Sequence, residues 1–195
     1  SAVVAQNIDR PAPATTGMNY AYDQTDDDGI ELVMSCITTK GREGIDRFTV
    51  GKQAFSAELE FSIGTVAGTD DCLWGFRKVE ALNATVDNYD EMAALNVISG
   101  NINIETILNN AATTTTDTTA NWADGEIHAL KVIVSKAGAV TYKIDGLAPS
   151  TTAAFSFDDG EVVTPFFHQL QASGLTGLLI LRKLTVESDN GSMES

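Results

Sequence analysis

The chain has 195 residues, which suits a single domain because β-sandwiches often run to about 200–250 residues as one unit. Hydrophobic residues make up 43% of it, too many for a disordered chain. The formal net charge is −15, and the 12 basic residues are scattered singly or in pairs. Phosphate backbones and anionic membranes attract clusters of Lys and Arg, so we expect neither nucleic acid nor membrane partners. No apolar run approaches the ~20 residues of a membrane span.

The first 29 residues predict an irregular arm ahead of the folded domain. Pro11 and Pro13 interrupt regular structure, and residues 23–29 form a polar, turn-prone stretch. We expect an extended arm that becomes ordered on entering the domain. Such an arm could also dock on a neighbouring subunit.

Strand signals begin at Ile30, where residues 30–38 are apolar and rich in β-forming residues. Residues 54–63 give the clearest pattern in the chain. One face carries Phe55, Ala57, Leu59, Phe61 and Ile63, and the other carries Ser56, Glu58, Glu60 and Ser62. Alternation with a period of two predicts a strand with one buried and one solvated face.

Similar runs predict further strands over residues 72–80, 93–98, 102–108, 127–135, 139–145, 162–170 and 178–186. Two pairs of these runs flank short turns, at Ser99–Asn101 and Lys136–Gly138, and predict hairpins. The threonine-rich stretch 111–120 is compatible with a surface loop and with an edge strand. The polar residues 188–195 predict a flexible tail.

The sequence contains few residues with obvious chemistry. Cys36 and Cys72 each lie in an apolar, strand-like run, which favours two reduced, buried thiols. His128 and His168 lie in separate predicted strands, and we expect each to be partly buried with a hydrogen-bonded ring. Zinc-ligand spacings, phosphate loops and the G-x-S-x-G elbow are absent from the sequence.

Acidic residues in predicted loops are candidates for a calcium site, although solvated turns use the same residue types. These candidates are Asp70, Asp71, Asp158 and Asp159, and our prediction is no bound cofactor, with calcium as the alternative. Glu58 and Glu60 alternate like glycosidase carboxylates, but a third acidic residue is missing at Ser62. Candidate glycan contacts are Trp74, Asp87, Asn88, Tyr89 and Trp122, where a core position is the competing interpretation for each tryptophan.

The most specific motif is the segment from Trp122 to Gly146, which contains His128, Gly138 and Asp145-Gly146. It resembles the W-x-D-G-x-x-H-x-L-x-V hairpin of concanavalin A-like and laminin-G-like jelly rolls. The resemblance implies an all-β, two-sheet antiparallel jelly-roll sandwich over residues 30–187. The arm would then occupy residues 1–29 and the tail residues 188–195.

The whole chain also resembles structural proteins of tailed bacteriophages, in its acidic composition, threonine-rich loop and irregular arm. This resemblance implies a non-catalytic capsid decoration protein on the virion surface. It would bind the major capsid protein and its own copies. A carbohydrate-binding, lectin-like module that binds glycans is the alternative. A glycoside hydrolase or lyase of the same fold comes last, because the paired-carboxylate pattern is missing.

Overall fold

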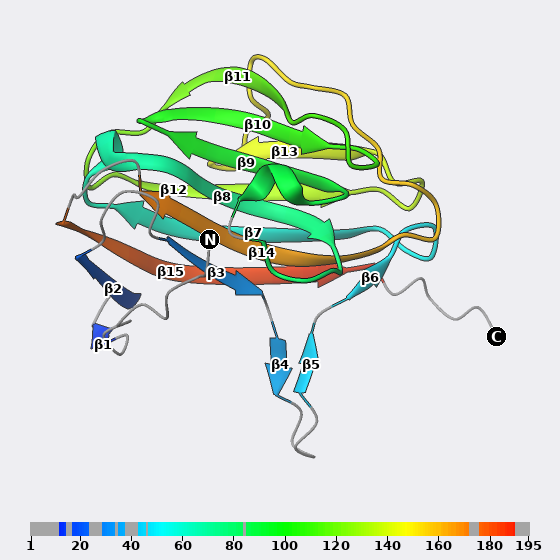
Figure 1. Cartoon of the computed structure of the whole chain (residues 1–195), viewed down its shortest axis with the longest axis horizontal. Coiled ribbons are helices and arrows are strands. Elements are labelled where there is room, and N and C mark those ends of the chain that lie inside the picture. Colours follow the sequence, from blue (N-terminus) through cyan, green and yellow to red (C-terminus); the bar gives the residue numbers. More distant parts are fainter. Residues whose placement is uncertain are drawn as a thin grey trace.

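The computed structural model describes residues 12–14, 17–23, 29–33, 35–37, 43–45, 47–83, 85–171 and 176–189. Within them, two antiparallel sheets stack face to face (Figure 1). Sheet A contains β1 (Ala12–Ala14), β2 (Gly17–Asp23), β7 (Phe55–Ile63), β12 (Ile127–Val134), β13 (Val140–Ile144) and β15 (Thr176–Ser188). Their spatial order is β1-β2-β15-β7-β12-β13.

Sheet B contains β3 (Gly29–Val33), β6 (Phe48–Thr49), β8 (Thr69–Lys78), β9 (Met92–Ile98), β10 (Asn101–Ile107), β11 (Thr114–Asn121) and β14 (Val162–Gln171). Their order is β11-β10-β9-β8-β14-β3, and β6 pairs with β14 beside this path. A separate two-stranded ribbon, β4 (Ser35–Ile37) and β5 (Glu43–Ile45), projects away from the sandwich (Figure 1). Two single-turn 3₁₀ helices, η1 (Val66–Gly68) and η2 (Val86–Asn88), lie in connections.

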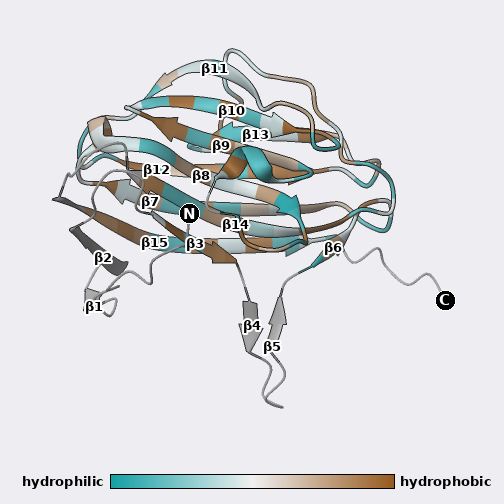
Figure 2. Ribbon diagram, viewed as in Figure 1, coloured by the Kyte–Doolittle hydropathy of each residue, from teal (hydrophilic) through white to brown (hydrophobic). Residues whose placement is uncertain are grey.

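The core lies between the two sheets and is built by alternating residues of each strand. The inward residues of β7 that the alternation predicted, from Phe55 to Ile63, are all buried. They meet Trp74 and Phe76 of β8 and Phe167 of β14 across the interface. Figure 2 shows the resulting alternation of hydropathy along the strands. The predicted all-β jelly-roll sandwich is therefore confirmed.

Both predicted hairpins are present, because short turns with positive φ join their strands. Ser99 and Gly100 connect β9 to β10, and Gly138 lies in the turn between β12 and β13. A Cβ on Gly138 would lie 2.4 Å from the carbonyl oxygen of Phe157, so this position requires glycine. The threonine-rich stretch forms β11, the edge strand of sheet B.

Two predictions of chain organisation need correction. The stretch 30–38 does not form one strand: β3 belongs to sheet B, whereas β4 pairs with β5 outside the sandwich. The supposedly irregular arm contains β1 and β2, and β2 pairs with the first half of β15 at the edge of sheet A. Edge pairing satisfies backbone hydrogen bonds whatever the side-chain pattern, so weak alternation did not reveal these strands.

Candidate functional site

The polar side chains with unusual burial lie on the outer face of sheet B. The inward residues of its strands belong to the main core, so their neighbours in sequence point outward. Backbone pairing aligns one outward row across six strands, from edge to edge of the sheet. The row consists of Asp117, Asn103, Asn96, Leu73, His168 and Glu31.

Residues 85–91, here called the covering segment, cross this outer face (Figure 1). Val86 and Tyr89 are buried there in a second hydrophobic cluster, separate from the main core. The sheet contributes the remaining members of that cluster: Leu73, Met92, Ala94, Ile107 and Phe166. Thr113 Oγ1 donates a hydrogen bond to Asp87 at the β11 side of the face. The segment therefore shields the apolar centre of the face from solvent.

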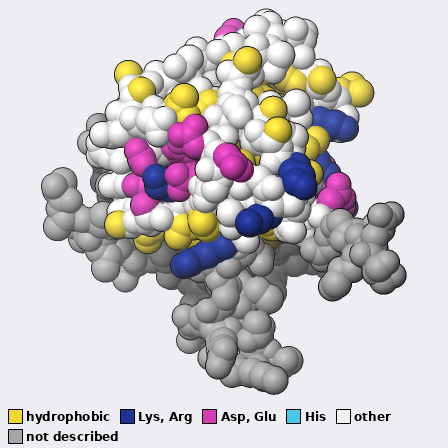
Figure 3. All heavy atoms as spheres, turned by 90° about the vertical axis from the view of Figure 1, so that its right-hand side faces the viewer, with side chains coloured by type: hydrophobic (Ala, Val, Ile, Leu, Met, Phe, Trp, Pro, Cys, Tyr) yellow, Lys and Arg dark blue, Asp and Glu magenta, His cyan; other side chains and the backbone are white. Residues whose placement is uncertain are grey.

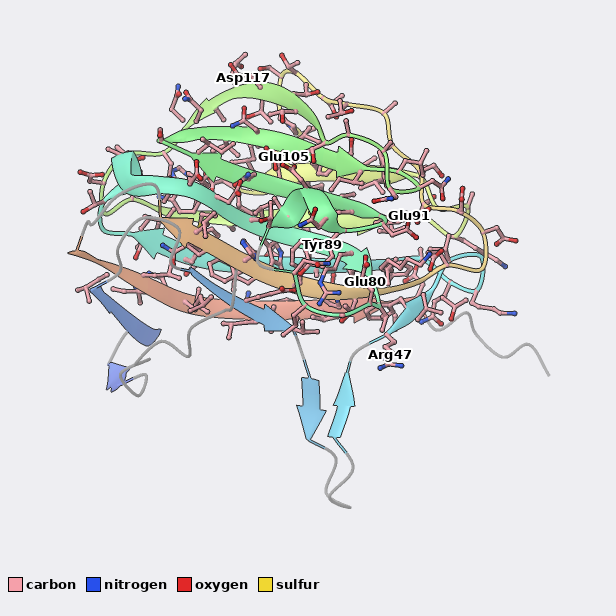
Figure 4. All side chains as sticks on the ribbon, viewed as in Figure 1. Arg47, Glu80, Tyr89, Glu91, Glu105 and Asp117 are labelled. Atoms are coloured by element: carbon pink, nitrogen blue, oxygen red, sulfur yellow. The ribbon has the colours of Figure 1, made fainter. Side chains whose placement is uncertain are left out.

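Under the covering segment lies a group that we call the buried cluster: Glu31, Arg77, Tyr89 and His168. Arg77 Nε donates to Glu31 Oε1 at 2.8 Å, and the two side chains are only 2% and 7% exposed. The Tyr89 hydroxyl donates to the second oxygen of Glu31. The Arg77 guanidinium also lies 4.6 Å from the centre of the Tyr89 ring. Figure 4 shows Tyr89 beneath η2 at the middle of the face.

His168 completes the buried cluster from β14, opposite Glu31 of β3. The prediction that its ring is hydrogen-bonded is wrong, because neither ring nitrogen has a partner within the described part of the protein. Burial, and secondarily the charge of Arg77, lower the pKa of His168 to about 4. The imidazole is therefore neutral at physiological pH.

Beside the buried cluster, the same face carries a group that we call the polar strip: Asp71, Asn96, Asn103, Glu105 and Asp117. Asn96 Nδ2 donates to Asp71 Oδ1 at 2.6 Å, and Asn96 Oδ1 accepts from the backbone N–H of Cys72 at 2.8 Å. Thr115 Oγ1 donates to Glu105 Oε1 at 3.3 Å. Figure 4 shows Glu105 on β10 and Asp117 on β11.

The polar strip has a negative electrostatic field. Burial, together with the charges of Asp71 and Asp87, raises the pKa of Glu105 to about 7. The pKa of Asp71 is also raised, mainly by burial and in part by Asp70 and Asp87. An additional anion placed on the polar strip would meet the same repulsion.

Two of the predicted glycan contacts are core residues instead. Trp74 is fully buried between the sheets and donates its indole N–H to the Ala57 carbonyl oxygen. Trp122 is 2% exposed, packs on Phe61 and donates to the Glu126 carbonyl oxygen. Neither ring offers a face to a ligand.

The other three predicted glycan contacts come together on the covering segment. Asp87 and Asn88 are exposed there, while Tyr89 is buried against the sheet. Their contact with a glycan stays a prediction.

The four predicted calcium ligands do not converge. Asp70 and Asp71 lie at the first end of β8, whereas Asp158 and Asp159 lie in the loop before β14, near the other end of β8. Among the residues whose side chains are described, no group of three or more His, Cys, Asp or Glu has a geometry that could hold a metal ion. The described residues also contain no helix long and apolar enough to span a membrane.

Cys72 and His128, which the sequence also singled out, lie outside the buried cluster and the polar strip. Cys72 is a buried free thiol, as predicted, and the Cys36 side chain lies outside the described residues. Burial raises the pKa of the Cys72 thiol well above its usual range, so it stays protonated. His128 has the predicted hydrogen-bonded ring: Nδ1 lies 2.7 Å from Asp145 and Nε2 lies 3.2 Å from Glu126.

Glu58 and Glu60, the candidate carboxylate pair, lie on the outer face of sheet A. Their strand neighbours Leu59 and Phe61 belong to the core, so both glutamates point to solvent. They lie on the opposite side of the sandwich from the buried cluster.

The buried cluster was missed by sequence reasoning because its members come from β3, β8, β14 and the covering segment. A usable signal was present. Glu31 and His168 each interrupt an apolar run at an outward position. Because charged and polar residues are seldom buried unless they are paired, such an interruption indicates a buried polar group.

No protein-family model matches the chain, and no curated protein matches its sequence. Solved structures share its fold. An alginate lyase from Pseudomonas aeruginosa matches with a TM-score of 0.61 and 12% identity, over 93% of this chain and 87% of that one. An alginate lyase from Corynebacterium sp. matches with a TM-score of 0.58 and 12% identity, over 89% and 77% of the two chains. A functionally unknown protein from Saccharomyces cerevisiae matches with a TM-score of 0.56 and 11% identity, over 95% of each chain.

These similarities correct the predicted role. We expected a non-catalytic bacteriophage virion protein on the grounds of composition and a jelly-roll fold. The fold is instead shared with several alginate lyases, including a marine alginate lyase from Zobellia galactanivorans at a TM-score of 0.52. The predictions of a non-catalytic protein and of a capsid decoration role are therefore overturned. At 12% identity, the similarity to these structures shows a shared fold alone.

Proposed function

We propose that the chain is a carbohydrate-active enzyme of the polysaccharide lyase type and that its active site is the buried cluster on sheet B. The observation that carries this proposal is the combination of a cation, a neutral base and a phenol in one buried group. Elimination next to a carboxylate needs these three chemical roles. The alginate lyases of similar fold support the reaction class.

Each member of the buried cluster has a role in such an elimination. Arg77 uses Nε and Nη1 within the protein, so Nη2 is the nitrogen that we assign to the uronate carboxylate. Neutralising that carboxylate acidifies the adjacent C–H, and His168 removes this proton with one of its unpartnered ring nitrogens. The electron pair forms the C=C bond while the glycosidic C–O bond breaks. Tyr89, whose pKa is raised so that it keeps its proton, supplies that proton to the leaving oxygen.

Glu31 is a positioning residue in this proposal. It accepts bonds from both Arg77 and Tyr89, so one carboxylate fixes the cation and the phenol relative to each other. The described conformation is the closed one, since Val86 and Tyr89 fill the space over the face. Substrate entry requires the covering segment to swing away from the sheet, and its return brings Tyr89 to the bound sugar.

The test uses the purified chain and a panel of uronate-containing polysaccharides. Elimination creates a conjugated double bond, so we expect growth of ultraviolet absorbance together with new reducing ends. His168→Gln should lower kcat by about 10²–10⁴-fold, the usual contribution of a positioned acid or base. His128→Gln, in sheet A and outside the buried cluster, is the matched control and should retain activity. New reducing ends without absorbance, or full activity in His168→Gln, would refute the proposal.

A second experiment tests the opening of the covering segment. Asp87 and Thr113 are hydrogen-bonded across the edge of the face, so the double variant Asp87→Cys/Thr113→Cys should lock the segment closed by a disulfide. We expect activity to be lost in the oxidised protein and to return on reduction. Activity that is equal in both redox states would show that substrate enters by another route.

A further inference from the structure

The polar strip continues the proposed active site along the direction in which a glycan would extend. Asn96 and Asn103 lie in the same cross-strand row as His168. Neighbouring strands are about 4.8 Å apart, so Asn96 lies about 10 Å from His168 along this row. Asn96, Asn103 and Glu105 are buried in the closed conformation. Once the covering segment has opened, a polysaccharide with one sugar over His168 therefore places its next sugars over the polar strip.

The charges of the two halves of this face differ. The buried cluster contains a cation, Arg77, which is already paired with Glu31. The polar strip contains the carboxyl groups of Asp71, Glu105 and Asp117, and none of its five members is a Lys or an Arg. A carboxylate on the neighbouring sugar would be repelled there, whereas hydroxyl and amide groups would find carboxylate and amide partners.

The unpartnered ring of His168, the proposed base, also indicates that this face meets a ligand. Both ring nitrogens of His168 lack a partner within the described part of the protein, although the residue is only 3% exposed. Buried polar atoms are nearly always hydrogen-bonded, so an unpartnered ring in the same row as the polar strip is a feature that a polar ligand would satisfy.

We infer that the substrate is a mixed polysaccharide in which the cleaved uronate is flanked by an uncharged sugar, and that the polar strip selects that uncharged neighbour. This inference rests on the proposed function. It departs from the substrate named for the enzymes of similar fold, because alginate is a polymer of uronates in which every sugar carries a carboxylate.

The test compares two polymers on the wild-type chain. Hyaluronan is unsulfated and alternates a uronate with a neutral N-acetylhexosamine, whereas alginate has uronates throughout. We expect kcat/KM for hyaluronan to exceed that for alginate by roughly tenfold or more at low salt. The ratio should fall as salt screens the polar strip. An alginate value equal to or above that for hyaluronan overturns the inference while the proposed function stands.

Variants of the polar strip test the cause of the preference. Above pH 7, where Glu105 is ionised, Asp117→Asn, at an exposed position, and Glu105→Gln each remove a charge and should raise kcat/KM for alginate several-fold. Glu58→Gln removes a charge from the outer face of sheet A and serves as the matched control. An unchanged alginate value in both variants would overturn the inference.

Binding gives a readout that does not depend on catalysis. Affinity electrophoresis of the wild-type chain in gels containing hyaluronan or alginate should show retardation by hyaluronan alone at low salt. Equal retardation by both polymers, or retardation by neither, overturns the inference. Retardation by hyaluronan without formation of unsaturated products supports selection by the polar strip and refutes the lyase activity. Failure of this inference and failure of the proposed function are therefore distinguishable.

Discussion

The outer faces of the two sheets place charges in opposite environments. On sheet A, Lys131 lies 3.0 Å from Glu187, and the two side chains are 22% and 60% exposed. On sheet B, Arg77 lies 2.8 Å from Glu31 at 2% and 7% exposure. The lengths are similar, but an exposed pair contributes little, while a buried charge that loses its partner is strongly destabilising. We therefore expect a functional role for the buried pair, because burying two charges gives little net stability.

The largest expected effect comes from breaking the buried pair. Arg77→Met leaves the Glu31 carboxylate buried with the Tyr89 hydroxyl as its remaining partner, which should cost about 3–5 kcal/mol of unfolding free energy. Equilibrium urea unfolding measures this loss. Adding Glu31→Gln to Arg77→Met should recover a substantial part of it, because the uncompensated charge is then removed.

The matched control is Lys131→Met on sheet A, which should change the unfolding free energy by no more than about 1 kcal/mol. Similar losses in Arg77→Met and Lys131→Met would mean that the two faces are equally solvated. The distinction between the faces would then have no energetic basis.

The pH dependence of stability gives the next effect. Glu91, labelled toward the right-hand end of the sandwich in Figure 4, is fully buried. Figure 3 views the molecule from that side, where acidic side chains gather. Lys78 pairs with Asp90, the chain neighbour of Glu91, and with Glu161. Both Glu91 oxygens lack a partner among the described residues. Burial, then the charges of Glu161 and Asp158, raise its pKa to about 7. The folded protein thus holds a proton that the unfolded chain releases near pH 4.5.

The contribution of Glu91 to stability is therefore complete below about pH 4.5 and is lost as the pH rises to about 7. Glu91→Gln cannot ionise, so its stability relative to wild type should rise across this window by up to about 3 kcal/mol. Urea unfolding at several pH values measures the difference. A constant difference between variant and wild type would contradict the prediction.

His168 and Glu105 make the pH test specific to sheet B. Since the pKa of His168 is lowered to about 4, its contribution has the opposite sign and is lost as the pH falls from about 6.5 to 4. Glu105, with a pKa of about 7, follows the same direction as Glu91. His168→Gln and Glu105→Gln should therefore change the pH profile in opposite directions.

The same contrast explains what the sequence could reveal. Residues 54–63 predicted β7 correctly because apolar and polar side chains alternate with a period of two. The prediction that the polar face is solvated is wrong at Ser56 and Ser62, which are buried as well. Sheet B breaks this rule on its outer face, where Leu73 and Phe166 are buried as well. Its strands consequently have long apolar runs, which predict a strand without showing which side carries a site.

The order of strands is the other information that the sequence lacks. Glu31 and Arg77 meet because β14 lies between β3 and β8, although 46 positions separate the two residues in the chain. Tyr89 joins them only because the covering segment folds back over the sheet. These arrangements follow from the packing of both sheets together, so local patterns in residues 29–33 and 69–78 could not predict them.

The smallest expected effect concerns the carboxylates that sequence analysis singled out. The double variant Glu58→Gln/Glu60→Gln alters two side chains of β7 that face solvent on sheet A. Exposed substitutions away from special features usually change stability by no more than about 0.5 kcal/mol. We expect unchanged urea unfolding and unchanged formation of unsaturated product. A loss of activity with intact folding would place the reaction on sheet A, because these two glutamates are separated from the buried cluster by the whole core.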